Sequence, residues 1–399
     1  MHSNCKPVAG IIADDLTGAA EVAGVAWHCN LSAEVHTGIE AAFSADVVSL
    51  DTDSRELSVT EAVRRVTKAS RRLRGHQADL IYKKVDSVLR GSVLQELKAV
   101  QAVFKFERVL LVPSNPGMGR VIKRGCYYIG GKLIHKSDFH HDPNHPCHFS
   151  RVIELLGANG TQTLSLRRPN QSLPARGIII GQAASKEDLQ TWAARLDKTI
   201  LPAGAAEFFA AILEAKGYAR NTHPFLCAPK QSDEDITLFV CGSASESARK
   251  FLTNCRRRGL PVMAIPNQLM APESATDAYR HKWAKATVRA FRHNRCVIVS
   301  INKPVMDGAL MSKWLRDQLV AAVISVMKKV QVNRLCIEGG STAAALLHSL
   351  GWQKMTAVHE FSPGIVAMRS PKGASITAII KPGSYAWPDE LTNQICSRR

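Results

Sequence analysis

Short apolar runs alternate with segments of helical periodicity through the first half of the chain, and this alternation constrains the fold more than any other feature. The apolar runs lie at residues 8–13, 46–50, 80–84 and 108–113, and the helical segments at Gly18–Cys29, Val59–Leu73 and Ser92–Phe104. A further strand is expected at 177–181, with helices near 185–195 and 204–217. Strands that alternate with helices of about 10 to 15 residues indicate a parallel α/β sheet.

The second half of the chain repeats this pattern. Its apolar runs lie within residues 236–245, 261–266, 296–301 and 334–340. Between the halves, residues 218–235 contain two prolines and polar clusters without periodicity, which is typical of a linker. Because 399 residues exceed one typical core, we predict two domains, at 1–225 and 235–399. The predicted fold class is α/β, with two doubly wound, Rossmann-like domains and an active-site cleft between them.

Composition excludes several classes of protein. No apolar run approaches the roughly 18 residues that span a bilayer, so no membrane partner is expected. The first ten residues contain no apolar stretch before a cleavage site, which predicts no signal peptide and a cytoplasmic location. The ten cysteines include no C-x-x-C pair, and in a chain of this length they indicate reduced thiols rather than a disulfide framework.

The net charge of +18 is unusual and has more than one explanation. A nucleic-acid partner, an anionic small substrate and a general basic bias are all compatible with it. The densest basic stretch, residues 64–74, places its charges on one helical face, which favours a solvated surface. No zinc-finger, helix-turn-helix or RNP pattern accompanies it, so we expect no nucleic-acid partner.

Polar residues follow each predicted strand of the first half. They lie at Asp14 and Asp15, at 51–55, at 83–92 and at 113–120. In doubly wound sheets ligands bind at the carboxyl ends of the strands, so these residues are expected to share one site.

The residue types at these strand ends indicate the kind of ligand. Lys83, Lys84, Arg55 and Arg90 are suited to an anion, and arginine can grip a carboxylate with two hydrogen bonds. Asp14, Asp15 and Asp86 can accept hydrogen bonds from hydroxyls, and one of them can serve as a general base. Both sets together suit a polyhydroxy acid.

The second half contains neither G-x-x-x-x-G-K-[ST] nor a convincing G-x-G-x-x-G. It has three small-residue turns instead, at 241–247, 338–347 and 381–388. In the middle turn a strand ends in Gly339-Gly340, and Ser341 and Thr342 begin a helix. Backbone N–H groups at such a helix start form an anion site, although a simple capped helix has the same sequence.

Five histidines, one cysteine and two aspartates crowd into residues 135–148. Such residues can bind metals, but prolines interrupt the segment and it lacks H-E-x-x-H or C-x-x-C spacing. We therefore predict no metal ligands here and favour a loop that covers a pocket.

Six ordered motifs resemble those of the four-carbon acid sugar kinases. They are "IADDLTGA", "KKVDSVLRGS", "PSNPGMGR", "F-x-x-DP", "GGSTA" and "KPGSYAWP", and they span Ile11 to about Leu391. The resemblance implies an N-terminal domain that binds the sugar acid and a C-terminal domain that binds ATP, with Mg²⁺ as the metal cofactor. Family members phosphorylate threonate, erythronate or 3-oxo-tetronate, typically on the terminal 4-hydroxyl.

The resemblance also carries site residues onto this chain. It implies sugar-acid binding by Asp14, Arg55, Lys84, Ser87 and Arg90, and nucleotide binding by Ser243, Gly339, Gly340, Ser341, Thr342 and Gly383. For the catalytic base we favour Asp15 or Asp86, because both follow predicted strands beside basic residues. The "KKVDS" form is more similar to the threonate and erythronate branch, which predicts D-threonate or D-erythronate as substrate.

One departure from the family pattern keeps alternatives open. The family often has an acidic residue after the double glycine where this chain has Ser341, and Glu338 is a candidate substitute at a different spacing. The alternatives are a 3-oxo-tetronate kinase and a catalytically degenerate basic regulatory protein. A haloacid-dehalogenase-type phosphatase needs a second aspartate two positions after the first, and Leu16 stands there. The oligomeric state is left open, with a homodimer as one candidate.

Overall fold

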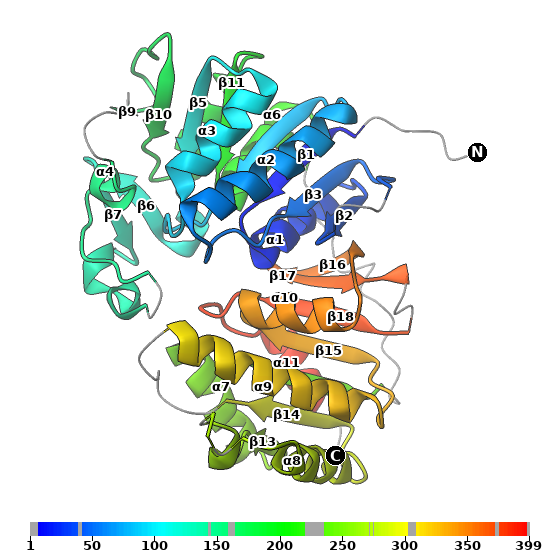
Figure 1. The fold of residues 1–399 in the computed structure, drawn as a ribbon. Coiled ribbons are helices and arrows are strands. Elements are labelled where there is room, and N and C mark those ends of the chain that lie inside the picture. Colours follow the sequence, from blue (N-terminus) through cyan, green and yellow to red (C-terminus); the bar gives the residue numbers. More distant parts are fainter. Residues whose placement is uncertain are drawn as a thin grey trace. The chain divides into compact units, whose positions relative to one another are not determined.

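The computed structural model describes residues 7–38, 42–142, 145–158, 164–219, 235–270, 272–273, 275–301, 309–371 and 375–396. The chain divides into two compact units, residues 1–223 and 224–399 (Figure 1). Most of the predicted linker, residues 220–234, lies outside the described residues.

Unit 1 is built on a parallel sheet with the strand order β2-β3-β1-β4-β11-β5-β10-β9. The strands are β1 (Ala9–Ala13), β2 (Ala33–His36), β3 (Val47–Asp51), β4 (Leu80–Lys84), β5 (Arg108–Val112), β9 (Leu164–Arg167), β10 (Gly177–Gly181) and β11 (Ile200–Gly204). From β1 the chain passes to β2 and β3 on one side and then to β4 on the other, which creates a topological switch point at β1. The predicted doubly wound α/β fold is confirmed for this unit.

Helices cover both faces of this sheet. They are α1 (Leu16–His28), α2 (Val59–Gly75), α3 (Val93–Phe104), α5 (Lys186–Ala194) and α6 (Ala206–Ala215). Helices α2 and α3 contact each other on one face, and α1 contacts α6 on the opposite face (Figure 1). Local capping explains several boundaries, since the side chains of Ser58 and Ser185 accept hydrogen bonds from the first turns of α2 and α5.

The segment after Pro113 contains a small antiparallel sheet that the sequence analysis does not predict. Its strands are β6 (Arg120–Lys123), β7 (Cys126–Ile129) and β8 (Lys132–Leu133), followed by the 3-10 turns η2 (Ile134–Lys136) and η3 (Asp138–His141) and by α4 (Val152–Leu155). These strands are only two to four residues long, too short for a clear period-2 pattern.

Unit 2 has the strand order β13-β14-β12-β15-β18-β17-β16. The strands are β12 (Thr237–Cys241), β13 (Val262–Ala264), β14 (Cys296–Ser300), β15 (Arg334–Glu338), β16 (Lys354–Ser362), β17 (Ile365–Arg369) and β18 (Thr377–Lys381). The pairings from β13 to β18 are parallel, whereas β16 and β17 form an antiparallel hairpin that the sequence reasoning missed.

The helices of unit 2 are α7 (Glu246–Arg257), α8 (Asp277–Ala290), α9 (Ala309–Met327), α10 (Gly340–Ser349) and α11 (Asp389–Cys396). Helix α10 starts directly after β15, as the double-glycine pattern predicts. Among the described residues of both units, no helix is long and apolar enough to cross a membrane.

Candidate active site

The strand ends of unit 1 are aligned, which brings the residues that follow them to one edge. Ala13, the last residue of β1, is in register with Asp51 of β3 on one side and with Lys84 of β4 on the other. The residues that follow these three strands are therefore neighbours in space, although they come from distant parts of the chain.

Arg55 is the centre of this edge. Its Nε donates to Asp14 Oδ2 (2.8 Å), its Nη1 donates to Asp15 Oδ2 (2.7 Å), and its Nη2 lies 3.9 Å from Asp86 Oδ1. Burial would lower the pKa of Arg55, but the three carboxylates hold it well above its usual value. The predicted carboxylates and this arginine thus form one charge network.

The two adjacent aspartates have different roles in the fold. Asp15 is the N-cap of α1, where its Oδ1 accepts from Gly18 N (2.8 Å) and its Oδ2 accepts from Thr17 Oγ1 (2.5 Å) as well as from Arg55. Burial opposes ionisation of Asp15, but Arg55 and Lys84 lower its pKa overall. Both oxygens of Asp15 are therefore occupied.

Asp14 keeps one oxygen without a partner in the described part of the chain. Its Oδ2 is bonded to Arg55, whereas its Oδ1 is buried and has no hydrogen-bond partner among the described residues. A buried unpaired carboxylate oxygen is energetically unfavourable unless a ligand or solvent group completes it. Asp14 Oδ1 can thus accept one further hydrogen bond at this edge.

The two consecutive lysines of β4 point to opposite faces of the sheet, as period-2 geometry requires. Lys84 Nζ lies 3.2 Å from Glu21 Oε2 of α1; burial lowers the pKa of Lys84, but Glu21 and the nearby aspartates raise it overall. Lys83 points the other way, is 0% exposed and pairs with Glu96 of α3 (2.8 Å). The expectation that Lys83 receives an anion is therefore wrong, because its ammonium is enclosed.

Asp86 and Arg90 form a two-pronged pair at the end of β4. Arg90 Nε donates to Asp86 Oδ2 (2.7 Å) and Arg90 Nη2 donates to Asp86 Oδ1 (3.0 Å). Burial would raise the pKa of Asp86, but Arg90 and Arg55 hold it well below its usual value. Gly91 has φ +84°, and a Cβ there would lie 3.1 Å from the carbonyl oxygen of Arg55, so glycine lets this turn approach the Arg55 loop.

The small antiparallel sheet and the histidine-rich segment, residues 135–148, contribute groups that the sequence reasoning did not assign. Arg120 donates to Ser87 Oγ, and Asp142 accepts from Arg90 Nη1 (3.0 Å). The ring of Phe139 lies under the guanidinium groups of Arg90 (5.6 Å) and Arg120 (5.7 Å). The signal was present, because Arg120 ends "PSNPGMGR", and Phe139 and Asp142 belong to "F-x-x-DP".

Asp51 is a further carboxyl at this edge. Burial is the main reason that its pKa is raised well above the usual value, and the nearby charges of Asp53, Asp15 and Asp14 act in the same direction. Its Oδ1 accepts from Asp53 N (2.8 Å).

Three turns converge in unit 2. Ser245 Oγ donates to Gly383 O (2.6 Å), and Ser243 Oγ lies 3.5 Å from the same oxygen. A Cβ on Gly383 would lie 2.8 Å from Ser243 Oγ, and one on Gly242 would lie 2.0 Å from Thr342 Oγ1. The three turns are thus brought together, and Gly242 and Gly383 are positions at which a larger side chain would be crowded.

The middle turn opens helix α10. Gly339 is its N-cap with φ +95°, a conformation that favours glycine, and no side chain caps the helix start. Ser341 is exposed in the first turn, whereas Thr342 is buried against Gly242. A helix start of this kind presents N–H groups and the positive end of the helix dipole to an anion.

Glu338 does not reach this helix start. It is fully buried and pairs with the buried Lys381 (3.1 Å), whose Nζ also donates to Pro382 O (3.0 Å) and Tyr385 O (2.5 Å). Burial raises the pKa of Glu338 and lowers that of Lys381. The idea that Glu338 replaces the acidic residue missing at Ser341 therefore lacks support.

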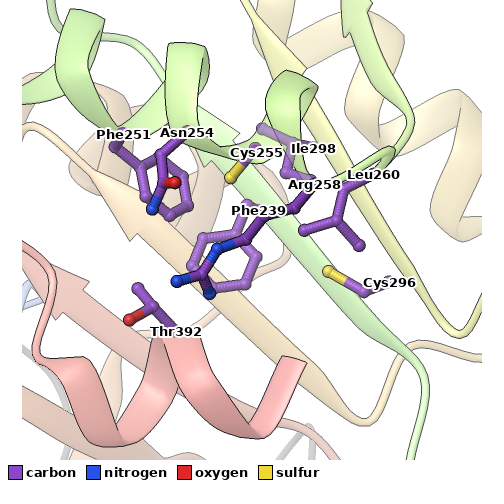
Figure 2. A pocket seen from close by; sticks show the side chains of 9 residues that line it. All are labelled: Phe239, Phe251, Asn254, Cys255, Arg258, Leu260, Cys296, Ile298 and Thr392. Atoms are coloured by element: carbon purple, nitrogen blue, oxygen red, sulfur yellow. The ribbon is translucent and has the colours of Figure 1, made fainter. Parts of the chain in front are cut away.

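A small cavity in unit 2 lies away from these turns. Figure 2 shows its lining residues Phe239, Phe251, Asn254, Cys255, Arg258, Leu260, Cys296, Ile298 and Thr392, between α7, α11 and the sheet. Its volume is about 10 Å³, which is room for a single water molecule. Cys296 is the first residue of β14, so the cavity is not at the carboxyl edge where the turns meet.

The histidine-rich segment shows no metal centre in its described part. His140 Nδ1 lies 3.2 Å from Cys147 O, His135 Nδ1 lies 2.7 Å from Ser150 Oγ, and His145 pairs with Glu56 (3.3 Å). Across the described residues of the chain, no group of three or more His, Cys, Asp or Glu side chains is placed to hold a metal ion.

The fold and these two edges define a class of protein. It is a two-unit α/β protein with one edge of carboxylates and guanidinium groups, suited to a polyhydroxy acid, and one edge of glycine turns, suited to a phosphate-bearing ligand. Comparison with known proteins agrees with this division. Residues 9–212 match the model of a sugar-binding N-terminal domain, and residues 238–385 match that of a nucleotide-binding C-terminal domain.

Individual relatives extend over nearly the whole chain. The chain is 24% identical to the D-threonate kinase of Bordetella bronchiseptica, over 96% of both proteins. It is also 24% identical to the 3-oxo-tetronate kinase of Pseudomonas fluorescens, over 97% of this chain and 96% of that protein. A crystal structure of a Haemophilus influenzae protein has the same fold, with a TM-score of 0.68 at 17% identity over 97% of this chain and 100% of that one. The chain belongs to the four-carbon acid sugar kinase family.

Proposed function

We propose that this protein is an ATP-dependent kinase that phosphorylates the terminal 4-hydroxyl of a four-carbon acid sugar, D-threonate or D-erythronate. The observation that carries the proposal is the Arg55 network, in which a guanidinium group and an unpaired oxygen of Asp14 lie at one strand edge. Membership of the family and relatives named D-threonate and D-erythronate kinase support the substrate class.

The polar edge of unit 1 divides naturally into two parts. Arg55, Arg90 and Lys84 supply the positive charge that a sugar carboxylate needs, and arginine does so with paired hydrogen bonds. Ser87, held by Arg120, adds a hydroxyl beside them. Asp14 Oδ1 then accepts a hydroxyl of the substrate.

We assign the general base to Asp14 rather than to Asp15 or Asp86. Asp15 is committed to the helix cap and to Arg55, and both oxygens of Asp86 are bonded to Arg90. A carboxylate takes a proton at an oxygen that can accept the hydrogen bond of the hydroxyl, and Asp14 Oδ1 has no other partner among the described residues. The substrate hydroxyl transfers its proton to Asp14 Oδ1, and its oxygen then becomes the attacking nucleophile.

Unit 2 fits a nucleotide by its backbone rather than by its charges. Gly339, Gly340, Ser341 and Thr342 would hold phosphate oxygens at the start of α10, with Ser243 and Gly383 completing the adjacent turns. When bound, ATP supplies the phosphoryl group and Mg²⁺ neutralises its charge. Mg²⁺ is commonly held by substrate phosphates, water and one or two carboxylates, so this role does not require three protein ligands.

A substrate screen tests the proposal. The full-length protein is incubated with Mg²⁺ and ATP together with D-threonate, L-threonate, D-erythronate or 3-oxo-tetronates, and ADP release is measured. We expect D-threonate or D-erythronate to give the highest kcat/KM, with the phosphate on the 4-oxygen by NMR. ADP release that no four-carbon acid raises above the acid-free rate would overturn the proposal and favour a non-enzymatic binding protein.

A further inference from the structure

A chain of buried polar groups lies beneath the Arg55 network. Glu96 of α3 receives Lys83 Nζ on one oxygen (2.8 Å) and Ser54 Oγ on the other (2.7 Å). Ser54 Oγ lies 2.8 Å from Thr52 Oγ1. The Lys83 and Glu96 side chains are 0% and 2% exposed, and Ser54 is fully buried, so these groups do not reach a ligand directly.

These groups fix the backbone of the loop that carries Arg55. Thr52 Oγ1 donates to Ala13 O (2.7 Å), and the backbone N–H groups of Ser54 and Arg55 donate to Asp14 O (2.9 and 3.3 Å). The loop is thereby bound to the end of β1 on one side and to Glu96 on the other. Both the position of Arg55 and that of Asp14 depend on this arrangement.

The ion pair has an orienting effect beyond charge balance. Because Lys83 holds one oxygen of Glu96, the other oxygen is directed at Ser54, and Lys83 Nζ also donates to Lys84 O (2.9 Å). A buried ion pair is seldom a net source of stability, since well-packed apolar residues of similar volume often serve as well. Here the Lys83–Glu96 pair specifies geometry, because it directs the second oxygen of Glu96 at Ser54.

We propose that Glu96, oriented by Lys83, is a positioning residue that holds Ser54, and through it Arg55, in the geometry that binds the carboxylate of the acid sugar. The inference rests on the proposed function of this edge. It assigns a role to Lys83, Glu96 and Ser54, which do not touch the substrate. It also confines their effect to the acid-sugar side, because the side-chain contacts of Glu96 and Ser54 among the described residues all lie within unit 1.

The sharpest test removes only the link between the pair and the loop. Ser54→Ala leaves the Lys83–Glu96 pair intact but deletes the hydroxyl that Glu96 holds. We expect KM for the acid sugar to rise about tenfold, the effect of losing roughly one well-placed hydrogen bond, with KM for ATP changed less than twofold. Ser70→Ala is the matched control, because Ser70 is equally buried in unit 1 but donates only to Val66 O within α2.

A second variant distinguishes a specific rise in KM from a general loss of folding. The double variant Lys83→Met and Glu96→Leu replaces both charges with apolar groups of similar size, which buried pairs often tolerate. We expect it to keep a cooperative thermal transition and to show the same rise in KM for the acid sugar as Ser54→Ala.

The outcomes separate the two proposals. If Ser54→Ala or the folded double variant keeps the wild-type KM for the acid sugar, or raises both KM values equally, the positioning role is overturned while the kinase function stands. If the wild-type protein phosphorylates no four-carbon acid, the proposed function fails, and the inference fails with it.

Discussion

The two units bury the same kind of ion pair beneath the carboxyl edges of their sheets but use it differently. In unit 1 the Lys83–Glu96 pair holds a side-chain hydroxyl, that of Ser54. In unit 2 the Lys381–Glu338 pair acts on the backbone, since Lys381 donates to two carbonyl groups of the turn that contains Gly383. The difference matches the edges, because unit 1 presents charged side chains and unit 2 presents main-chain turns.

This comparison teaches how each kind of ligand site is kept in place. A site made of charged side chains needs each charge oriented by a partner, as Arg55 is by three carboxylates. A site made of N–H groups needs its backbone fixed, and glycine with close packing achieves that. Substitutions should therefore affect the two sites in different ways, and the following predictions test that difference from the largest expected effect to the smallest.

The largest effect is expected at Asp14. Asp14→Asn keeps the size of the side chain but removes the group that accepts the proton, so kcat should fall by about 10²- to 10⁴-fold, the usual contribution of a general base. Steady-state kinetics at saturating ATP measure this loss. Asp15→Asn is the comparison: asparagine caps a helix about as well as aspartate, but the change removes the charge that faces Arg55 and Lys84, so it should mainly lower stability, by about 1.5 to 3 kcal/mol. A normal kcat for Asp14→Asn with a large loss for Asp15→Asn or Asp86→Asn would return the base to one of the residues first favoured.

Removal of Lys381 should affect unit 2 through stability and ATP binding together. Lys381→Met leaves Glu338 buried without its partner, which should lower the free energy of unfolding by about 3 to 5 kcal/mol and raise KM for ATP. Because burial already raises the pKa of Glu338, protonation should relieve part of the defect as the pH falls. Urea unfolding at several pH values measures this. The double variant Lys381→Met with Glu338→Gln should recover much of the stability, and a full loss there would contradict the explanation.

A smaller effect is expected from crowding the turns to which we assign the nucleotide. Gly383→Ala would bring a Cβ to 2.8 Å from Ser243 Oγ, so either the Ser243 side chain or the turn must shift. We expect KM for ATP to rise about 3- to 10-fold, equivalent to roughly 1 kcal/mol, with KM for the acid sugar unchanged. Gly75→Ala is the control, since nothing lies within 4 Å of a Cβ there. An unchanged KM for ATP would show that Gly383 is not part of the proposed nucleotide site.

The smallest effect is a gain in stability at Asp51. The pKa of Asp51 is raised in the folded protein, so folding favours the protonated form of this carboxyl group. Its contribution to the free energy of unfolding is therefore present below the unfolded pKa and is lost as the pH rises through the folded pKa. Asp51→Asn should therefore raise the melting temperature at pH 7 to 8 by about 2 to 4 °C, and the gain should vanish near pH 4. Asp197 should show the opposite effect, because its pKa is lowered, chiefly by a hydrogen bond from Thr199, and its ionised form stabilises the fold. Asp197→Asn should therefore lower the melting temperature at neutral pH. Equal shifts at both pH values would contradict the electrostatic cause.

Much of the fold could be predicted because its signals are local. The segments predicted as helices at 18–29, 59–73 and 92–104 correspond to α1, α2 and α3, whose ends agree within two residues. Apolar runs marked the central strands, because strands buried on both faces are nearly continuous in apolar residues. The β16–β17 hairpin was missed, although Pro363-Gly364 between two apolar stretches is a readable turn signal.

The sequence by itself determined which residues follow the strands, and therefore which chemical groups gather at each edge. Only the tertiary structure decided their partners. Lys83 and Lys84 are neighbours in the chain, yet one is enclosed with Glu96 and the other faces Glu21. Arg55 bonds to both Asp14 and Asp15, from which it is 41 and 40 residues away in the chain. The two aspartates differ because only Asp15 also caps a helix. The physical reason is that a charge interacts through space, so its partner depends on how the strands are ordered in the sheet and not on proximity along the chain.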